Sequence, residues 1–206
     1  MRRALASIGA DEVDDAVRAL KQLFFHARTH RHWLAHDVSD HTLRSLYEAV
    51  RLAPTSSNCS PGRFVFVKSP EAKKRLLEFV SPRNVESART APVTVIVAQD
   101  LRFYLRLPKL FPGRDVARTF AGNPHLITET AFRNSTLQGA YLVMAARALG
   151  LDCGLMSGFD RPKLDAEFFP DGLWTANFLV NLGYGDPAKL SSRLPRLSFD
   201  EACRIV

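Results

Sequence analysis

Cysteine is scarce in this sequence: only Cys59, Cys153 and Cys203 occur in 206 residues, and they form no CxxC pair. An odd number of unpaired thiols is typical of a protein from the reducing cytosol and argues against a disulfide framework. We therefore expect a cytoplasmic protein. Cys59 would be a nucleophile if a helix end and the nearby histidines lowered its pKa. Because no catalytic cysteine signature surrounds it, a small buried thiol is the favoured interpretation.

Long apolar runs are also missing. The longest uncharged stretch, residues 134–146, is too short to cross a bilayer. The start, "MRRALASIGADEVDD", is weakly apolar and soon acidic, so we expect no signal peptide and no membrane partner. Residues 1–12 are expected to form a flexible extension of a single domain that spans residues 1–206, a length that supports one full hydrophobic core.

Nucleotide and metal motifs are absent as well. No GxGxxG follows a predicted strand and no GxxxxGK[ST] occurs, which disfavours a Rossmann dinucleotide crevice and a P-loop. The pairs His26/His30 and His32/His36 are spaced i, i+4, but no nearby cysteine completes a tetrahedral set and HExxH is absent. We expect no bound metal.

Acidic residues are outnumbered 28 to 21 by lysine and arginine, which gives a net charge of +7. This excess indicates either a solvated basic surface or attraction for anionic ligands. No RNP, helix-turn-helix or zinc-finger spacing accompanies it, so we expect no nucleic-acid partner.

Hydrophobic periodicity predicts alternating helices and strands, hence an α+β or α/β class. Ser39 and Ser69-Pro70 are expected to begin helices, Gly150 to end the longest one, and Ser198 with Glu201 to form a capping box. Within the longest helix, the stretch "LQGAYLVMAARAL" (137–149) is small and apolar nearly all round, which predicts burial on most sides. Helices are expected at residues 12–28, at 39–53, from Ser69-Pro70 onward and at about 125–149. Strands are expected at 63–69, 91–99 and 176–185, and a mobile excursion or lid with one short helix at 101–122.

Four stretches contain more hydrogen-bonding, charged or glycine residues than a plain connection between helices and strands needs. The loop within "APTSSNCSPGRFVFV" (53–67) has six hydrogen-bonding residues where a turn needs two or three, which suggests a polar, planar ligand. The stretch "ARTHRHW" (27–33) places basic residues at a predicted helix end, where they would also serve the helix dipole. The glycines of "GLMSGFD" (154–160) would admit a ligand to the backbone or make an ordinary turn, and "RLPR" (193–196) offers two arginines to a phosphate.

In order and spacing, these stretches resemble the FMN-dependent nitroreductase family over nearly the whole chain. The segments "PTSSNCSP", "TAFRNSTLQGAYLVMAARALGLD", "MSGFD" and "GYGDPAKLSSRLPRLSFDEA" are most similar to its malonic semialdehyde reductase branch. The resemblance implies an α+β sandwich in which helices flank a mainly antiparallel, four-stranded central sheet. It also implies an intertwined homodimer with two FMN sites at the interface.

The resemblance also implies roles for individual residues. Arg28, Thr29 and His30 would meet the FMN phosphate and ribityl chain, together with the terminal Arg196. The flavin ring would be lined from the partner subunit by Pro54, Thr55, Ser56 and Asn58, and from its own subunit by Asn84, Ser157 and Gly158, whose N–H would lie near flavin N5. We expect Ser56 and Asn58 to tune the flavin rather than the fold.

Three departures from the family pattern matter. The family's Gln-Pro-Trp is Ser60-Pro61-Gly62 here, so the pocket floor lacks an aromatic wall. The lysine two residues before Arg196 is Leu194, which leaves Arg193 as its substitute, and a lysine common just after Asn84 is Ser87. The sequence therefore does not identify which residue supplies the cation that faces flavin N1 and O2.

The implied reaction is ping-pong: NAD(P)H reduces FMN and leaves, and a small acceptor then takes the hydride. No side chain stands out as an acid or base, in line with chemistry carried by the cofactor. In the branch it resembles, the acceptor is malonic semialdehyde (3-oxopropanoate) and the product is 3-hydroxypropanoate. A broad nitro or quinone reductase and a non-catalytic flavin sensor or carrier are the alternatives, and NADH and NADPH stay equally open.

A carboxylate acceptor needs a cation, and the 101–122 segment offers several. Irregular, proline-broken segments over active sites often select substrates. The candidate substrate residues are Arg102, Tyr104, Arg106, Arg114 and Arg118. A solvated basic loop is the alternative for each arginine.

Overall fold

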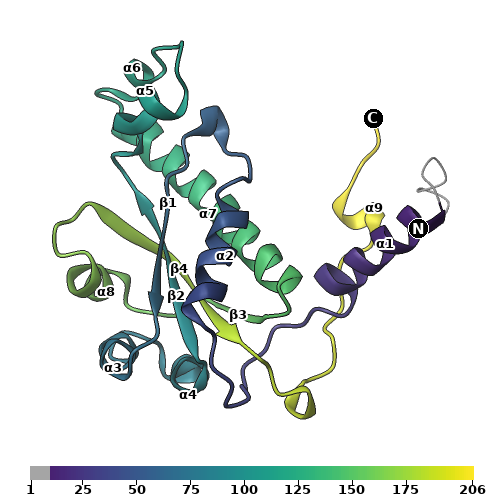
Figure 1. Ribbon diagram of the computed structural model, residues 1–206. Helices are drawn as coiled ribbons and strands as arrows, with labels where there is room; N and C mark the ends of the chain where they lie inside the picture. The colour runs from purple at the N-terminus through teal and green to yellow at the C-terminus, as the bar shows by residue number, and fades with distance from the viewer. Residues whose placement is uncertain (1–9) are drawn as a thin grey trace.

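The computed structural model describes residues 10–206. Its centre is an antiparallel four-stranded sheet in the order β1-β2-β4-β3. The strands are β1 (Gly62–Val67), β2 (Val93–Asp100), β3 (Asp152–Met156) and β4 (Trp174–Gly183). Helices α2 (Asp40–Val50) and α7 (Pro124–Ala148) cover one face, and α3 (Pro70–Leu77), α4 (Pro82–Thr90) and α8 (Arg161–Phe168) cover the other (Figure 1). The predicted α+β sandwich is confirmed.

Strand β2 shows why the sheet forms the core. All eight of its residues are buried. Successive side chains point to opposite faces, so Val93, Val95 and Val97 pack towards α2 and α7. Ile96 and Ala98 pack towards α3, α4 and α8. The unbroken apolar run in the sequence reflects this burial on both sides.

The residues predicted to begin and end helices occupy those positions in the structure. Ser39 accepts a hydrogen bond from the Thr42 N–H, and Ser69 accepts one from Ala72 in front of Pro70 at the first helical position. Gly150, at φ +80°, follows the end of α7 in the left-handed region that glycine adopts without strain. Ser198 and Glu201 form the predicted capping box at α9 (Phe199–Ala202).

The first helix differs from its prediction. Helix α1 (Ala10–Leu20) continues into a π-helical turn, η2 (Lys21–Phe25), and ends there rather than at residue 28. The chain then pairs with the edge strand β3: Thr29 bridges Cys153, and the His30 N–H donates to the Cys153 carbonyl at 3.0 Å. The basic residues of segment 27–33 therefore do not sit at a helix end, because their backbone is extended beside the sheet. Residues 1–9 of the predicted N-terminal extension lie outside the described residues, and residues 10–12 belong to α1.

Two other predicted loops are more regular than expected. Residues 154–156 belong to β3, because they pair with Asn181, Val180 and Leu179 of β4, so only 157–160 form the loop. The 101–122 excursion contains three short helical pieces instead of one, because Phe103, Leu107 and Phe120 form a small core with Cys59 and Ala131. The pieces are η4 (Phe103–Arg106), α5 (Leu107–Leu110) and α6 (Ala117–Phe120).

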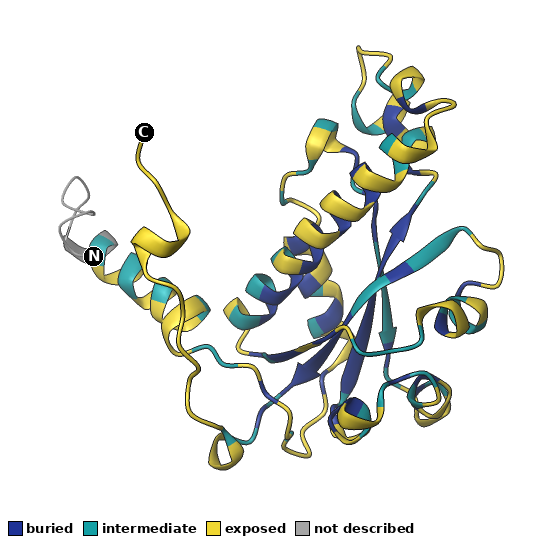
Figure 2. Cartoon of the chain, turned by 180° about the vertical axis from the view of Figure 1, so that it is seen from behind, coloured by how far each residue is buried: buried dark blue, intermediate teal, exposed yellow. Residues whose placement is uncertain are grey.

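Helix α7 is buried on one face only, contrary to the prediction of burial on most sides. Phe132 and Leu137 are 53% and 41% exposed, because none of residues 10–206 covers the outer face of the helix. The C-terminal arm, residues 190–206, likewise leaves the body beside α1 after the turn η5 (Pro187–Lys189), and its side chains are nearly all exposed (Figure 2). Within residues 10–206, no helix has the length and apolarity that a membrane span requires.

Candidate functional site

A basic cavity of about 700 Å³ lies between residues 27–32 and the strap formed by residues 189–196. It brings together Arg28, Thr29, His30, Arg193 and Arg196, as predicted from the motifs. Its basic lining residues are Arg28, Arg31, Arg147, Lys189, Arg193 and Arg196, and among the residues that line it Asp186 is the one carboxylate. Such an excess of positive charge favours the binding of an anion.

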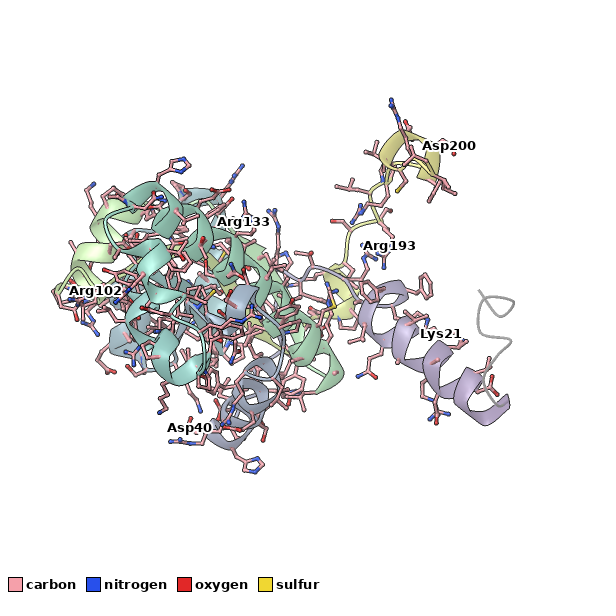
Figure 3. All side chains as sticks on the ribbon, turned by 90° about the horizontal axis from the view of Figure 1, so that it is seen from above. Lys21, Asp40, Arg102, Arg133, Arg193 and Asp200 are labelled. Atoms are coloured by element: carbon pink, nitrogen blue, oxygen red, sulfur yellow. The ribbon has the colours of Figure 1, made fainter. Side chains whose placement is uncertain are left out.

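The two sides of the cavity hold each other in place. The Arg28 guanidinium donates to the Ser191 carbonyl across the cavity. In the other direction, Arg193 Nη2 donates to the carbonyls of Phe25 and Ala27 at 2.8 and 2.9 Å. Figure 3 shows Arg193 at the base of the C-terminal arm, beside the helix that carries Lys21. Since each guanidinium has five N–H donors, these contacts leave donors of Arg28 and Arg193 for a ligand.

Arg196 and His30 contribute differently. Within residues 10–206, the Arg196 side chain bonds only to the adjacent carbonyls of Leu194 and Pro195, so its guanidinium also has donors left. His30 is 6% exposed, its Nε2 lies 3.4 Å from Asp152 Oδ1, and its ring packs so closely on Gly185 that a Cβ there would overlap it. The imidazole therefore anchors the segment to the sheet, while Thr29 is exposed on the cavity side.

Two cations of the cavity were missed by the motif analysis. Arg147, in the last turn of α7, donates from Nη1 to the Leu23 carbonyl at 2.8 Å, and its buried Nε has no partner among the described residues. Lys189 is exposed at the end of η5 and lines the cavity. Lys189 lies in "DPAKLSSRLPR", five residues before Leu194, the position at which the family pattern has its lysine.

A second predicted group assembles at the far end of β3. Asn84, in the first turn of α4, is 7% exposed, and its Nδ2 donates to the Gly158 carbonyl at 3.4 Å. A Cβ at Gly158 would lie 2.9 Å from Asn84 Nδ2 and 3.0 Å from Ser81 Oγ, so a side chain there would displace Asn84 or Ser81 from this contact. Ser157 is exposed next to this contact.

Strand β3 runs between the basic cavity and the Asn84–Gly158 contact. Leu155 is 46% exposed on this strand, whereas Cys153 is fully buried in the core. The four residue steps from Cys153 to Ser157 correspond to about 13 Å of extended chain between the two groups.

The predicted polar loop lies elsewhere. Residues 54–60 contain the turn η3 (Ser56–Asn58), and Ser57, Asn58 and Ser60 all have positive φ, at 48°, 51° and 39°. Three left-handed non-glycine residues in four positions mark a strained loop held by its surroundings.

Part of the polarity of this loop is structural. The Ser56 N–H donates to Asn134 Oδ1 of α7 at 2.8 Å, and the Ser60 N–H donates to Thr55 Oγ1 at 3.1 Å. Asn58 Nδ2 donates to the Leu110 carbonyl of α5 at 2.8 Å, which ties the loop to the 101–122 segment. Pro54, Ser56 and Asn58 nevertheless remain exposed, so the loop presents polar groups to the outside.

One chain does not bring the loop to the cavity. The loop is bound at Asn134 and the cavity is lined by Arg147, 13 residues later on the same helix, which corresponds to about 20 Å along the axis. The 101–122 segment sits with the loop, and Arg102 and Arg193 lie on opposite sides of the molecule in Figure 3. One extended ligand would contact both the cavity and the loop if the loop came from a second copy of the chain.

The substrate candidates differ in their contacts. Arg118 pairs with Asp115 at 2.6 Å, and Arg106 Nε lies 3.7 Å from Asp100. Tyr104 packs on Phe103 and Phe120, so it belongs to the small core of the segment. The side chains of Arg102 and Arg114 make no hydrogen bond or ion pair within residues 10–206.

The base of this segment is fixed by an ion pair that the sequence analysis missed. Arg63 Nη2 lies 2.6 Å from Asp100 Oδ2, with the two side chains 17% and 6% exposed. Asp100 also accepts the Arg102 N–H at 2.8 Å, so the end of β2 and the start of the 101–122 segment share one carboxylate.

Cys59 is a buried thiol, as favoured from the sequence. It is 1% exposed, and burial raises its pKa to about 11. A thiol that stays protonated at neutral pH is a poor nucleophile, so Cys59 serves the core beside Phe103 and Ala131.

Comparison with known proteins agrees with this geometry. The model of the Nitroreductase family matches residues 26–184. A Rhodopseudomonas palustris protein named as an NADH dehydrogenase/NAD(P)H nitroreductase is 59% identical over 187 residues, covering 91% of this chain and 95% of the relative. A Polynucleobacter asymbioticus protein with the same name is 58% identical and covers 92% and 96% of the two chains.

Solved structures agree in fold. A Bacillus subtilis nitroreductase superposes with a TM-score of 0.81 at 17% identity, covering 92% of this chain and all of that one. An Exiguobacterium sibiricum nitroreductase in complex with FMN superposes with a TM-score of 0.79 at 21% identity, covering 91% and 97%.

Proposed function

Because the chain belongs to the nitroreductase family, we propose that it is a homodimeric FMN enzyme that passes hydride from NAD(P)H to a small acceptor. Family membership supports FMN as the bound cofactor and NAD(P)H as the hydride donor, as the motifs predicted. The observation that carries the proposal is the basic cavity, where Arg28, Arg193 and Arg196 converge from the two ends of the chain.

The residues present fit FMN. Arg28, Arg193 and Arg196 have donors left for the phosphate, and charge-assisted bonds to phosphate are among the stronger hydrogen bonds in proteins. Arg147 and Lys189 add positive charge at the same end of the site. Beyond the exposed Leu155, Asn84 and the Gly158 backbone form a close-packed polar edge for the ring. When bound, FMN would supply the hydride transfer itself, and the protein orients it.

A homodimer completes this site. Pro54, Thr55, Ser56 and Asn58 are assigned to the flavin ring of the partner, because in their own chain they lie about 20 Å along α7 from the cavity. The exposed apolar residues Phe132 and Leu137 on the outer face of α7 give the second copy a surface to cover. Size-exclusion chromatography with light scattering should return twice the mass of the chain, and a monomer that retains FMN would contradict the shared site.

For the acceptor, malonic semialdehyde is our first candidate. Its carboxylate needs a cation that is not already paired, and Arg102 and Arg114 are such groups in the 101–122 segment. Arg118 and Arg106 are weaker candidates because Asp115 and Asp100 already face them. Tyr104 would shape the pocket through packing.

A broad nitro or quinone reductase is the second candidate. The names of the 58–59% identical relatives favour it, since they specify nitroreductase activity and no aldehyde. A non-catalytic flavin sensor or carrier would have the same cofactor site but no acceptor pocket.

A stopped-flow acceptor screen separates these functions. The purified protein is first reduced anaerobically with NADPH or NADH, and the return of flavin absorbance is then followed with 3-oxopropanoate, a nitroaromatic compound and a quinone. Fastest reoxidation by 3-oxopropanoate is the expected result. Reoxidation by the nitro compound or quinone alone would establish the broad reductase, and no reduction by either nucleotide would indicate the sensor or carrier.

A further inference from the structure

A chain of buried polar side chains crosses the sheet on the side covered by α3 and α4. Lys73 of α3 donates from Nζ to Thr94 Oγ1 of β2 at 2.8 Å. Thr94 in turn donates to Asn181 Oδ1 of β4 at 2.7 Å, and Asn181 Nδ2 donates to Ser87 Oγ of α4 at 3.2 Å. All four residues are less than 9% exposed.

The chain closes into a ring through the backbone of α4. Lys73 Nζ also donates to the Ala88 carbonyl at 2.7 Å. This carbonyl is one of the last four of α4, which lack partners inside the helix, and a cation is favourable at the negative end of a helix dipole. The Lys73 ammonium therefore caps a carbonyl in the last turn of α4 and, through Thr94, also ties this helix to the sheet.

Stability alone does not call for a lysine here. Among the described residues no carboxylate lies within ion-pair distance of Lys73. Burying a charge without an opposite charge is costly, and a well-packed apolar residue is often at least as stable in such a place. Burial lowers the pKa of Lys73 to about 8, which expresses the same cost.

Helix α4 connects the two ends of the proposed cofactor site. Its first turn carries Asn84, which contacts Gly158 at 3.4 Å. At its other end, the Ser87 carbonyl accepts a hydrogen bond from Trp33 Nε1 at 3.1 Å, and Trp33 belongs to the segment that carries Arg28. Asn181 also lies 3.7 Å from the sulfur of Met156, the residue before Ser157.

We propose that Lys73 is a positioning residue of the cofactor site: through Thr94, Asn181, Ser87 and Ala88 it fixes α4, so that Asn84 and Gly158 meet the flavin ring. The proposal rests on the FMN function proposed above. Lys73 does not itself touch the cofactor site, since it lines a separate groove between α3 and α4 with Lys74 and Arg89.

The test uses Lys73→Met, which keeps the unbranched apolar stem and removes the ammonium. Lys74→Met is the matched control, because Lys74 is the exposed neighbour on the same helix. Three quantities are compared with wild type: amide hydrogen exchange of the apoprotein, the FMN dissociation constant from flavin fluorescence, and the midpoint potential of the bound flavin.

In Lys73→Met we expect faster exchange in residues 82–90 and 157–160, an FMN dissociation constant raised about tenfold by loss of the buried hydrogen bonds, and a shifted midpoint potential. Lys74→Met should match wild type in all three. Unchanged FMN affinity and potential in Lys73→Met, whatever happens to exchange or melting temperature, would overturn the positioning role and leave a purely structural one.

If Lys73→Met fails to fold, Ser87→Ala provides the test, because it removes the Asn181–Ser87 hydrogen bond and leaves the ammonium in place. Ser87→Ala should change the FMN dissociation constant and the midpoint potential in the same directions as expected for Lys73→Met. Wild-type values of both would overturn the proposal. A wild-type protein that binds no FMN would instead overturn the proposed function, and this inference with it.

Discussion

Arg193 and Phe25 are 168 positions apart, yet the guanidinium of one donates to the carbonyl of the other at 2.8 Å. This contact closes the basic cavity between the two ends of the chain. Arg28 strengthens the closure from the opposite side through Ser191.

Removing the cavity arginines should release FMN. A hydrogen bond to a charged group contributes about 1.5–3 kcal/mol, so Arg28→Ala and Arg196→Ala should each raise the FMN dissociation constant about ten- to a hundredfold. Flavin content after purification and fluorescence titration of the apoprotein measure this. Arg51→Ala is the control, since Arg51 pairs with Glu48 on α2, outside the cavity. Wild-type flavin content in both cavity variants would refute the phosphate assignment.

Asn58 should affect the fold as well as the flavin. From the sequence we expected it to tune the flavin alone, but its side chain holds the Leu110 carbonyl and its φ is 51°. Asn58→Ala loses that bond and places an alanine in the left-handed region, for a loss of about 2 kcal/mol in unfolding free energy.

Asn58→Gly separates the two effects, because glycine accepts a positive φ. In denaturant unfolding of the apoprotein, the glycine variant should lose about 1 kcal/mol, the part due to the hydrogen bond. Equal loss in both variants would show that backbone strain is not involved.

The stability of the wild-type protein should depend on pH through Lys73. Its pKa is lowered to about 8 in the folded chain from 10.5. Below pH 8 both states carry the proton and the cost of burying the charge is fully present. Between pH 8 and 10.5 the unfolded chain binds the extra proton, so the free energy of unfolding rises with pH, by about 3 kcal/mol in total.

Lys73→Met lacks this titration. Wild type minus Lys73→Met in unfolding free energy should therefore increase from pH 7 to pH 10.5, and Lys74→Met is measured alongside as the control for loss of a lysine from the same helix. The other charged residues of the groove, Lys68, Glu78 and Arg89, are common to all three proteins and cancel in the difference. A flat difference for Lys73→Met would mean that the ammonium is as well solvated as in the unfolded chain.

Acceptor recognition should reside in the unpaired arginines. Arg102→Ala or Arg114→Ala should raise the KM for 3-oxopropanoate about ten- to a hundredfold and leave the KM for a neutral quinone unchanged. Arg118→Ala is the control, because Asp115 already neutralises that side chain. Steady-state kinetics with both acceptors would decide, and equal effects on the two would favour the broad reductase.

Local signals allowed much of the fold to be predicted. The helix caps are local, because Ser39, Ser69 and Ser198 each form their capping hydrogen bonds with the residue three positions later. The apolar run of β2 corresponds directly to its burial on both faces. The motifs also placed Arg28 with Arg196 and Asn84 with Gly158.

Features set by distant contacts were not predictable. The pairing of residues 29–30 with Cys153 replaced a helix end, and Asn58 found its partner 52 residues away. Neither the Arg63–Asp100 pair nor the Lys73 ring leaves a local pattern, because each joins side chains from separate elements.

Anaerobic titration of the purified protein with NAD(P)H tests the central claim most directly. The account predicts about one FMN per chain, complete loss of visible flavin absorbance on adding one equivalent of NAD(P)H, and its return on adding an acceptor. A protein that purifies and reconstitutes without flavin, or whose flavin absorbance is unchanged by either nucleotide, would contradict it.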